Sequence, residues 1–195
     1  MSQAARALKT PKTYATDLAR QRNTLQETIE LNPIGIVCSP YQERFAAPRQ
    51  PGGDIEGEIR LLPGNVMQSA LQDLDRFSHI WVIYWMHLNR GWNPTVIPPR
   101  EPRIRRGILS TRAPHRPNAL GLSAVRLLGI EDTVLRISGL DMLDGTPVLD
   151  IKPYLPYADA IDDANSGWLD DVGGGETPGE VCDMLDLTRS QSKIT

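Results

Sequence analysis

The chain has 195 residues, of which 40% are hydrophobic and 23% charged, a composition typical of one folded domain with tails and not of a disordered or fibrous protein. It contains no apolar run of the roughly 18 to 20 residues that a membrane span needs, and its first residues lack the apolar core of a secretory signal. Two cysteines, Cys38 and Cys182, are too few for a disulfide framework or, without other ligands, for a structural zinc site. We therefore expect a cytoplasmic protein with neither a membrane span nor a bound metal.

Charge is distributed unevenly, although the formal net charge is only −3. Residues 100–116 contain six arginines and one acid, whereas residues 157–187 contain nine acids and no lysine or arginine. The basic block is either a solvated loop or an anion site, because guanidinium groups bind phosphates and carboxylates in bidentate fashion. The acidic block has few apolar residues and includes GGGETPG, which indicates a mobile tail with a short helix over 178–187.

Short β-branched or alternating runs, separated by turn residues, predict a strand-rich middle. The first, IGIVCSP, is a strand closed by Ser39-Pro40, and the apolar run HIWVIYWM over 79–86 is long enough for a strand covered on both faces. The other predicted strands are GEIRLL (57–62), GILSTR (107–112), LSAVRLLGI (122–130), TVLRISGL (133–140) and PVLDIKPY (147–154). Gly121 and Asp144-Gly145 are predicted at bends, since glycine adopts positive φ at low cost.

Helices are few in this pattern. One is predicted near 66–74, and a weaker helical pattern runs over 14–29. Closely spaced strands without alternating helices favour an antiparallel barrel over a doubly wound sheet. The predicted fold is therefore mostly β: a small antiparallel barrel over 31–160, preceded by a helical arm (1–30) and followed by an acidic, flexible tail (161–195).

Several common catalytic motifs are absent from the sequence. No G-x-G-x-x-G fingerprint joins a strand to a helix, and there is no G-x-x-x-x-G-K-[ST] loop, so neither a Rossmann cofactor site nor a P-loop is indicated. The three histidines, His79, His87 and His115, are too scattered along the chain to predict a metal site.

Polar side chains are concentrated in three segments between the predicted strands. Residues 44–52 place an Arg-Gln pair between two prolines that stiffen the loop. Residues 110–123 combine two arginines, a histidine, an asparagine and several hydroxyl groups, which makes a dense array of donors. Residues 140–154 contain an Asp-Gly turn, followed by Asp150 and Lys152, which share one face of a strand and could form an ordinary ion pair.

In chain order, the sequence contains PRQPG, F-S-H-I-W, W-x-P-T-V-x-P-P-R, T-R-x-x-x-R-P-N-x-x-G and L-D-x-x-D-G-T-P-V-x-D-I-K-P-Y. This series, over residues 34–160, resembles the TrmO (TsaA-like) methyltransferases. The resemblance implies an S-adenosylmethionine-dependent enzyme built on a small β-barrel, usually a homodimer, that N-methylates N6-threonylcarbamoyladenosine beside the tRNA anticodon. The missing glycine fingerprint and the strand-rich pattern agree with it.

The resemblance also implies cofactor contacts for residues that match the family motifs. They are Pro48, Arg49, Gln50, His87, Leu88, Arg112, Leu122, Leu143, Asp144, Gly145 and Thr146. Leu88 stands where the family often has glutamine, so one side-chain contact is expected to become a backbone contact. This chain also has an acidic tail where some longer relatives carry a basic extension that helps to hold tRNA.

Methyl transfer from a sulfonium is an in-line displacement that needs no metal, so positioning of the acceptor nitrogen is the main requirement. The N6 of threonylcarbamoyladenosine is a poor nucleophile because its lone pair is delocalised, and we expect a base or strong acceptor near its N–H. The matched motifs supply the candidates: Asp150 or Asp144 as the base, Asn118 to orient the acceptor, Arg116 or Lys152 to hold the threonyl carboxylate, and His115 as a further base.

Two alternatives to a tRNA methyltransferase stay open from the sequence. The same cofactor and fold would also serve a small-molecule acceptor, or the barrel would be a non-catalytic cofactor-binding module. If tRNA is the acceptor, the basic block at 100–116 is expected to contact phosphates. Affinity would then fall with salt, with a log–log slope of about −0.9 per duplex phosphate contact or about −0.7 for single strands.

Overall fold

We describe residues 28–44, 46–100 and 102–172 of a computed structural model of the chain. The contact pattern divides the chain into two units, 1–31 and 32–195, and every strand and helix described below belongs to the second. The helix predicted in the N-terminal arm lies outside the described residues except for Thr28 and Ile29, which are not helical. The helix predicted in the acidic tail lies entirely outside them.

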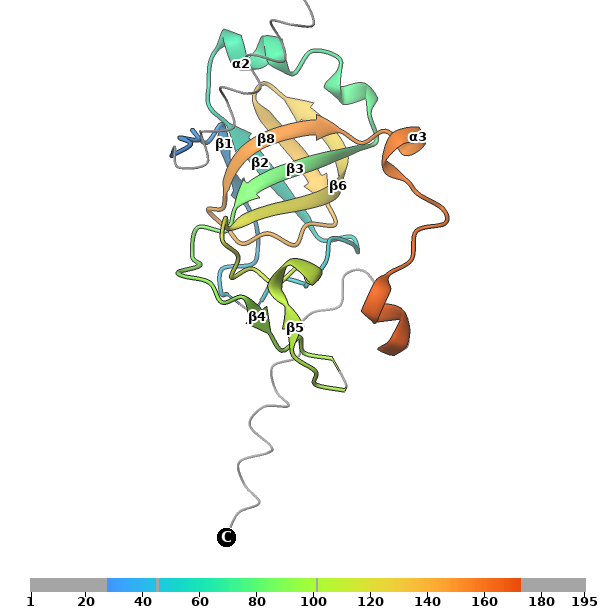
Figure 1. The fold of residues 1–195 in the computed structure, drawn as a ribbon. Coiled ribbons are helices and arrows are strands. Elements are labelled where there is room, and N and C mark those ends of the chain that lie inside the picture. Colours follow the sequence, from blue (N-terminus) through green and yellow to red (C-terminus); the bar gives the residue numbers. More distant parts are fainter. Residues whose placement is uncertain (1–27, 45, 101, 173–195) are drawn as a thin grey trace, which may run out of the picture. The chain divides into compact units, whose positions relative to one another are not determined.

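Six antiparallel strands close into a barrel (Figure 1). They are β1 (Gly35–Cys38), β2 (Glu56–Leu61), β3 (His79–Trp85), β6 (Leu120–Glu131), β7 (Val134–Ser138) and β8 (Pro147–Pro153). Their order around the barrel is β1-β2-β7-β6-β3-β8, and every neighbouring pair is antiparallel. The mostly β, barrel-type fold predicted from the closely spaced strands is therefore confirmed.

Alternation along the strands fills the barrel with aliphatic side chains. In β1, Val37 is fully buried while its neighbour Ile36 is 47% exposed. Ile59 of β2, Val82 of β3 and Leu135 of β7 are fully buried in the same way. Because burial of apolar surface stabilises a fold by roughly 25 cal/mol per Å², this interior holds the strands, and with them the loops at the barrel ends, in fixed positions.

The outer face of β3 is less covered than its sequence predicts. Trp85 is 47% exposed, and Trp81 and Ile83 are only partly buried. On the neighbouring strand β6, Leu120 pairs with Trp85 and is 42% exposed, while Leu122 pairs with Ile83 and is 56% exposed. The prediction of a strand covered on both faces is therefore wrong for the single chain, because only the inward positions meet the core.

The helices are short and connect the strands. α2 (Asn65–Ala70), which matches the helix predicted near 66–74, and the 3-10 turn η2 (Leu74–Arg76) lie between β2 and β3. α3 (Pro156–Asp159) and the 3-10 segment η4 (Gly167–Val172) follow β8. In the part of the chain that the structure describes, no helix has the length and apolar character needed to span a membrane.

The strand predicted over 107–112 is wrong beyond its first residue. A two-residue strand, β5 (Arg106–Gly107), pairs with β4 (Thr95–Val96), and the chain then turns through η3 (Ile108–Ser110). The Ser110 hydroxyl donates to the carbonyl of Gly107 at 2.8 Å, and the Thr111 hydroxyl donates to that of Ile108 at 2.9 Å. Such hydroxyl-to-backbone bonds compete with strand pairing and favour the turn.

Glycine is required for different structural reasons at the two positions that the sequence analysis singled out, 121 and 145. Gly145 has a φ of +71°, as expected for the second residue of an Asp-Gly turn. Gly121, by contrast, has no positive φ and lies within β6 opposite Tyr84. A Cβ at Gly121 would lie 2.1 Å from a carbon of the Tyr84 ring. The predicted bend at Gly121 is therefore wrong, and the residue is small because the phenol ring occupies the space beside it.

Candidate functional site

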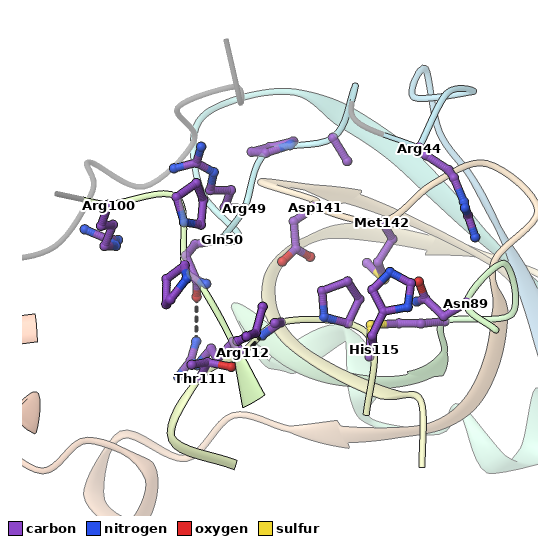
Figure 2. Close-up of a pocket in the computed structure, with 18 of the residues that line it drawn as sticks. Arg44, Arg49, Gln50, Asn89, Arg100, Thr111, Arg112, His115, Asp141 and Met142 are labelled. Atoms are coloured by element: carbon purple, nitrogen blue, oxygen red, sulfur yellow. Dashed lines mark hydrogen bonds between the residues drawn. The ribbon is translucent and has the colours of Figure 1, made fainter. Parts of the chain in front are cut away.

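The three polar segments of the sequence meet at a cavity of about 1010 Å³, part of whose lining is drawn in Figure 2. Val96 of β4 lines this cavity, and Figure 1 shows β4 and β5 at one end of the barrel. Its wall is built by the loop that follows β1, the end of β3 with the residues after it, the chain around β4 and η3, the connection from β7 to β8, and η4. The strands therefore bring together loops that are distant in the sequence, and the cavity combines cations, hydroxyl groups and apolar side chains.

Most of the residues that the motifs assign to a cofactor line this cavity. They are Pro48, Arg49, Gln50, His87, Leu88, Arg112, Leu143 and Thr146. Asp144 and Gly145 belong to the same turn as Leu143 and Thr146 but are not part of the wall. Leu122 lies on the outer face of β6, so its side chain does not reach the cavity of its own chain.

Two guanidinium groups fasten the cavity wall. Nη1 of Arg112 donates to Oε1 of Gln50 at 2.7 Å, a bond drawn in Figure 2 that joins the second polar segment to the first. Arg44 donates to the backbone carbonyl of Leu88, which joins the first segment to the residues after β3. Because both bonds connect residues far apart in the sequence, the wall is held together by the protein's own contacts before any ligand binds.

The Asp144 turn is anchored to the end of β1. The Asp144 carboxylate accepts a hydrogen bond from the Ser39 amide at 3.0 Å, and the Asp144 amide donates to the Tyr41 carbonyl at 2.8 Å. In addition, the amide of Gly145 donates to the carbonyl of Val37 at 2.9 Å. The carboxylate of Asp144 thus ties this turn to the residue after β1, and the turn holds Leu143 and Thr146 in the cavity wall.

The catalytic candidates from the sequence lie mostly outside the cavity. Nζ of Lys152 is 2.7 Å from Oδ2 of Asp150, in an ion pair whose side chains are 61% and 45% exposed, respectively. Asn118 is exposed in the loop before β6. None of these three lines the cavity, whereas the further candidate His115 does.

Arg116 clamps the loop that carries Arg112. Nη1 of Arg116 donates to the carbonyl of Thr111 at 2.7 Å, and it also approaches the carbonyls of Ile108 at 3.3 Å and Ala113 at 3.5 Å. A guanidinium shared among three carbonyls holds a loop that has no strand partners of its own. Arg116 therefore holds the loop that carries Arg112, although it does not itself line the cavity.

Asp141, which the sequence analysis did not assign to the site, lies in the cavity wall. It follows β7, and Figure 2 shows its carboxyl group directed into the cavity. The Ser123 hydroxyl donates to Oδ1 of Asp141 at 2.6 Å, and the Tyr84 hydroxyl lies 3.2 Å from Oγ of Ser123. Burial raises the pKa of Asp141 to about 6, although the hydrogen bond from Ser123 and the charge of Arg112 act in the opposite direction.

Trp168 of η4 is a second residue that the sequence analysis missed. Its indole nitrogen donates to the carbonyl of Ser110 at 2.8 Å, and the guanidinium carbon of Arg106 lies 5.0 Å from the centre of its ring. Trp168 and its neighbour Leu169 line the cavity. The described fold therefore extends beyond residue 160, where the sequence analysis places the start of the acidic tail, and part of that stretch borders the site.

Residues 36–160 match a family profile described as the tRNA-methyltransferase O N-terminal domain. This chain belongs to the tRNA-methyltransferase O family. Among its relatives, the tRNA (adenine(37)-N6)-methyltransferase of Escherichia coli K12 is 39% identical over 158 residues, which cover 76% of this chain and 67% of that protein. A "Probable S-adenosyl-L-methionine-binding protein" of Methanothermobacter thermautotrophicus is 45% identical over 134 residues, covering 68% of this chain and 95% of the relative.

Solved structures agree with this assignment. The crystal structure of TrmO from Pseudomonas aeruginosa superposes with a TM-score of 0.60 at 44% identity, over 72% of this chain and 62% of that chain. The chain thus spans under two thirds of that structure, whereas it spans nearly the whole of the Methanothermobacter protein. The barrel is therefore the part common to these members of the tRNA-methyltransferase O family, and Trp168 lies outside the stretch that matches the family profile.

Proposed function

We propose that this protein is an S-adenosylmethionine-dependent methyltransferase that methylates N6 of threonylcarbamoyladenosine beside the tRNA anticodon. The observation that carries the proposal is the convergence of the matched motifs on one cavity, with Arg49, Arg112 and Thr146 all in its wall. The names of the relatives support it, because the Escherichia coli protein is named a tRNA adenine methyltransferase and the Methanothermobacter protein an S-adenosylmethionine-binding protein.

The cavity suits such a cofactor in size and in chemistry. Small-molecule sites typically enclose about 300 to 1,000 Å³, so a cavity of about 1010 Å³ has room for a nucleoside-sized molecule together with part of an acceptor. Arg49 and Arg112 supply cations for a carboxylate, while Met86, Met142 and Leu143 supply apolar surface for an adenine ring and methylene groups. The bound cofactor would provide an electrophilic methyl group, and the protein's task is to hold both reactants in line and exclude water.

The acceptor is expected to approach over the arginine-rich side of the cavity. Arg100 and Arg112, from the basic block of the sequence, both line it and would meet a phosphate or the threonyl carboxylate. The sequence-based roles of Asn118, Arg116 and Lys152 in acceptor binding stay predictions. For Asp150, turnover by Asp150→Asn as fast as that of the unaltered protein would remove this residue from consideration as the base.

We also propose that the protein is a homodimer. The outer faces of β3 and β6 present a continuous apolar surface in which Trp85, Leu120 and Leu122 are each more than 40% exposed. An exposed apolar patch of this kind is typical of an interaction surface. A second copy would cover it and would bury Leu122, which the family motif assigns to the cofactor. Sedimentation should therefore show a dimer that Leu122→Asp converts to a monomer, and a monomeric unaltered protein would exclude this surface.

Transfer of a labelled methyl group tests the proposed reaction. The purified protein, with labelled S-adenosylmethionine, should label tRNA that carries threonylcarbamoyladenosine and leave tRNA that lacks this modification unlabelled. A small-molecule acceptor is the second candidate, favoured by the acidic residues Asp170 and Asp171 of η4 beside the cavity, which would repel RNA. Cofactor binding in calorimetry without any RNA labelling would favour that candidate, whereas absence of cofactor binding would contradict both.

A further inference from the structure

We propose that Asp141 is the general base of the methyl transfer. In this step, which rests on the proposed function, the lone pair of the acceptor nitrogen forms the bond to the methyl carbon. The carbon–sulfur bond breaks, and its electron pair stays on sulfur, which becomes a neutral thioether. The proton of the acceptor N–H passes to the carboxylate of Asp141, which later releases it to solvent. No oxidant, reductant or metal enters this balance.

Position is the first argument for Asp141. Among the described residues that line the cavity, it is the only one with a carboxylate. Its oxygen Oδ1 receives the Ser123 hydroxyl at 2.6 Å, and we assign proton transfer to Oδ2. The alternative carboxylate of Asp150 lies outside the cavity, is 45% exposed and is paired with Lys152 at 2.7 Å.

Orientation is the second argument, because a base needs a fixed direction as well as a place. Burial raises the pKa of Tyr84 well above its usual range, so its phenol keeps its proton and donates to Ser123. The Ser123 hydroxyl passes its own hydrogen to Asp141. Tyr84 and Ser123 are buried in the barrel and the Tyr84 ring packs against the backbone of Gly121, so this chain of hydrogen bonds is rigid. Both are positioning residues, since they act through Asp141.

Basicity is the third argument. A carboxyl with a pKa of about 6 is ionised at neutral pH yet accepts a proton far more readily than an ordinary carboxylate does. The titratable and charged groups around it are Tyr41, Tyr84 and Arg112, and across the cavity Arg44, Arg49, Arg100, His87 and His115. Arg112 opposes the rise in pKa, and burial outweighs it.

The test compares Asp141→Asn with Asp75→Asn, the same change at an exposed carboxylate of η2 that does not line the cavity. We expect Asp141→Asn to lower kcat by about 10²- to 10⁴-fold, the range for loss of a general base. Calorimetry should give dissociation constants for S-adenosylmethionine and S-adenosylhomocysteine within about threefold of the unaltered protein, because a base acts on the proton and not on cofactor binding. Asp75→Asn should change neither quantity.

The pH profile gives a readout that a merely structural role would not move. The acid limb of kcat/KM, which reports the free protein, should lie near pH 6 in the unaltered protein and be absent from the residual rate of Asp141→Asn. The Ser123 hydrogen bond lowers the pKa of Asp141, so Ser123→Ala should move the acid limb to higher pH without abolishing turnover. This second variant keeps the proposal testable even if Asp141→Asn does not fold.

Each remaining outcome overturns the proposal in a recognisable way. Turnover by Asp141→Asn at more than about a tenth of the unaltered rate means that Asp141 is not the base. A tenfold loss of affinity for S-adenosylmethionine, with S-adenosylhomocysteine unaffected, assigns Asp141 to recognition of the sulfonium charge instead. If Ser123→Ala leaves the acid limb at the same pH, the group that titrates in this limb is not Asp141. If the unaltered protein binds the cofactor but labels no tRNA, the proposed function fails and this inference falls with it.

Discussion

Replacement of Asp141 by asparagine is expected to stabilise the folded protein at neutral pH. Burial raises the pKa of the folded carboxyl from 3.8 to about 6, so between these values the folded state binds more protons than the unfolded state. The free energy of unfolding therefore falls as the pH rises through this interval. At about 1.4 kcal/mol for each pKa unit, the ionised carboxylate costs about 3 kcal/mol above pH 6. Asparagine keeps an oxygen acceptor for Ser123 and carries no charge, so Asp141→Asn should recover most of that free energy.

The pH dependence of the gain in stability of Asp141→Asn shows whether loss of the buried carboxylate charge is its cause. Urea unfolding between pH 4 and pH 8 should show a gain below about 1 kcal/mol at pH 4 that grows to about 3 kcal/mol by pH 7. The corresponding rise in melting temperature is about 6 to 12 °C for a protein of this size. Asp75→Asn is the matched control and should stay within about 0.5 kcal/mol at every pH. A difference that does not grow with pH, or an Asp141→Asn variant that is less stable at pH 8, would refute the reasoning.

Three further substitutions test the packing around the site. Gly121→Ala would place a Cβ 2.1 Å from the Tyr84 ring and should cost about 1 to 3 kcal/mol in urea unfolding, whereas unchanged stability would mean that the ring has room to move. Trp168→Phe removes the indole bond to the Ser110 carbonyl and should cost about 1 kcal/mol, and Trp168→Ala about 1 kcal/mol more, so equal melting curves for the two would contradict separate contributions. Lys152→Ala breaks an exposed ion pair and should change the free energy of unfolding by less than about 1 kcal/mol. A larger loss would contradict the assignment of this pair as an ordinary surface ion pair.

The barrel could be predicted because its strands carry their own signal. In GEIRLL, alternation predicts a strand with Ile59 inside, and the structure buries Ile59 completely while Arg60 stays on the outer face. The failure at 107–112 has a local cause. GILSTR contains the residue types of a strand, but the hydroxyls of Ser110 and Thr111 bond to nearby carbonyls, and composition alone does not show which partner a hydroxyl takes.

The cofactor loops could be predicted as motifs, but a motif does not say which side chains face the cavity. Arg112 and Leu122 both lie in matched segments, yet only Arg112 lines the cavity. The alternation of β6 contains the missing information. Ser123, Val125 and Leu127 are buried, so Leu122 must point outward. Once one inward residue of a strand is known, alternation along the sequence shows which of its other side chains face inward and which face outward.

Asp141 could not have been found in this way. It follows the end of β7, where alternation no longer applies, and its partner Ser123 is on β6. Their meeting depends on the register of β6 against β7, which shifts between Leu127 and Gly129. A one-residue shift of register is invisible in either strand's sequence, yet it decides which side chains meet across the barrel.

The same chain of hydrogen bonds connects the stability of the barrel to its chemistry. Tyr84 and Ser123 occupy inward positions in a largely aliphatic interior, and a buried hydroxyl is costly unless it has a partner. Each is satisfied by the next group toward the cavity, and the chain ends on a carboxylate whose ionisation opposes folding. A protein selected for stability alone would have a neutral or apolar residue at position 141. The presence of an ionisable group here, at a cost of about 3 kcal/mol, is the trade-off expected where a site needs a raised pKa.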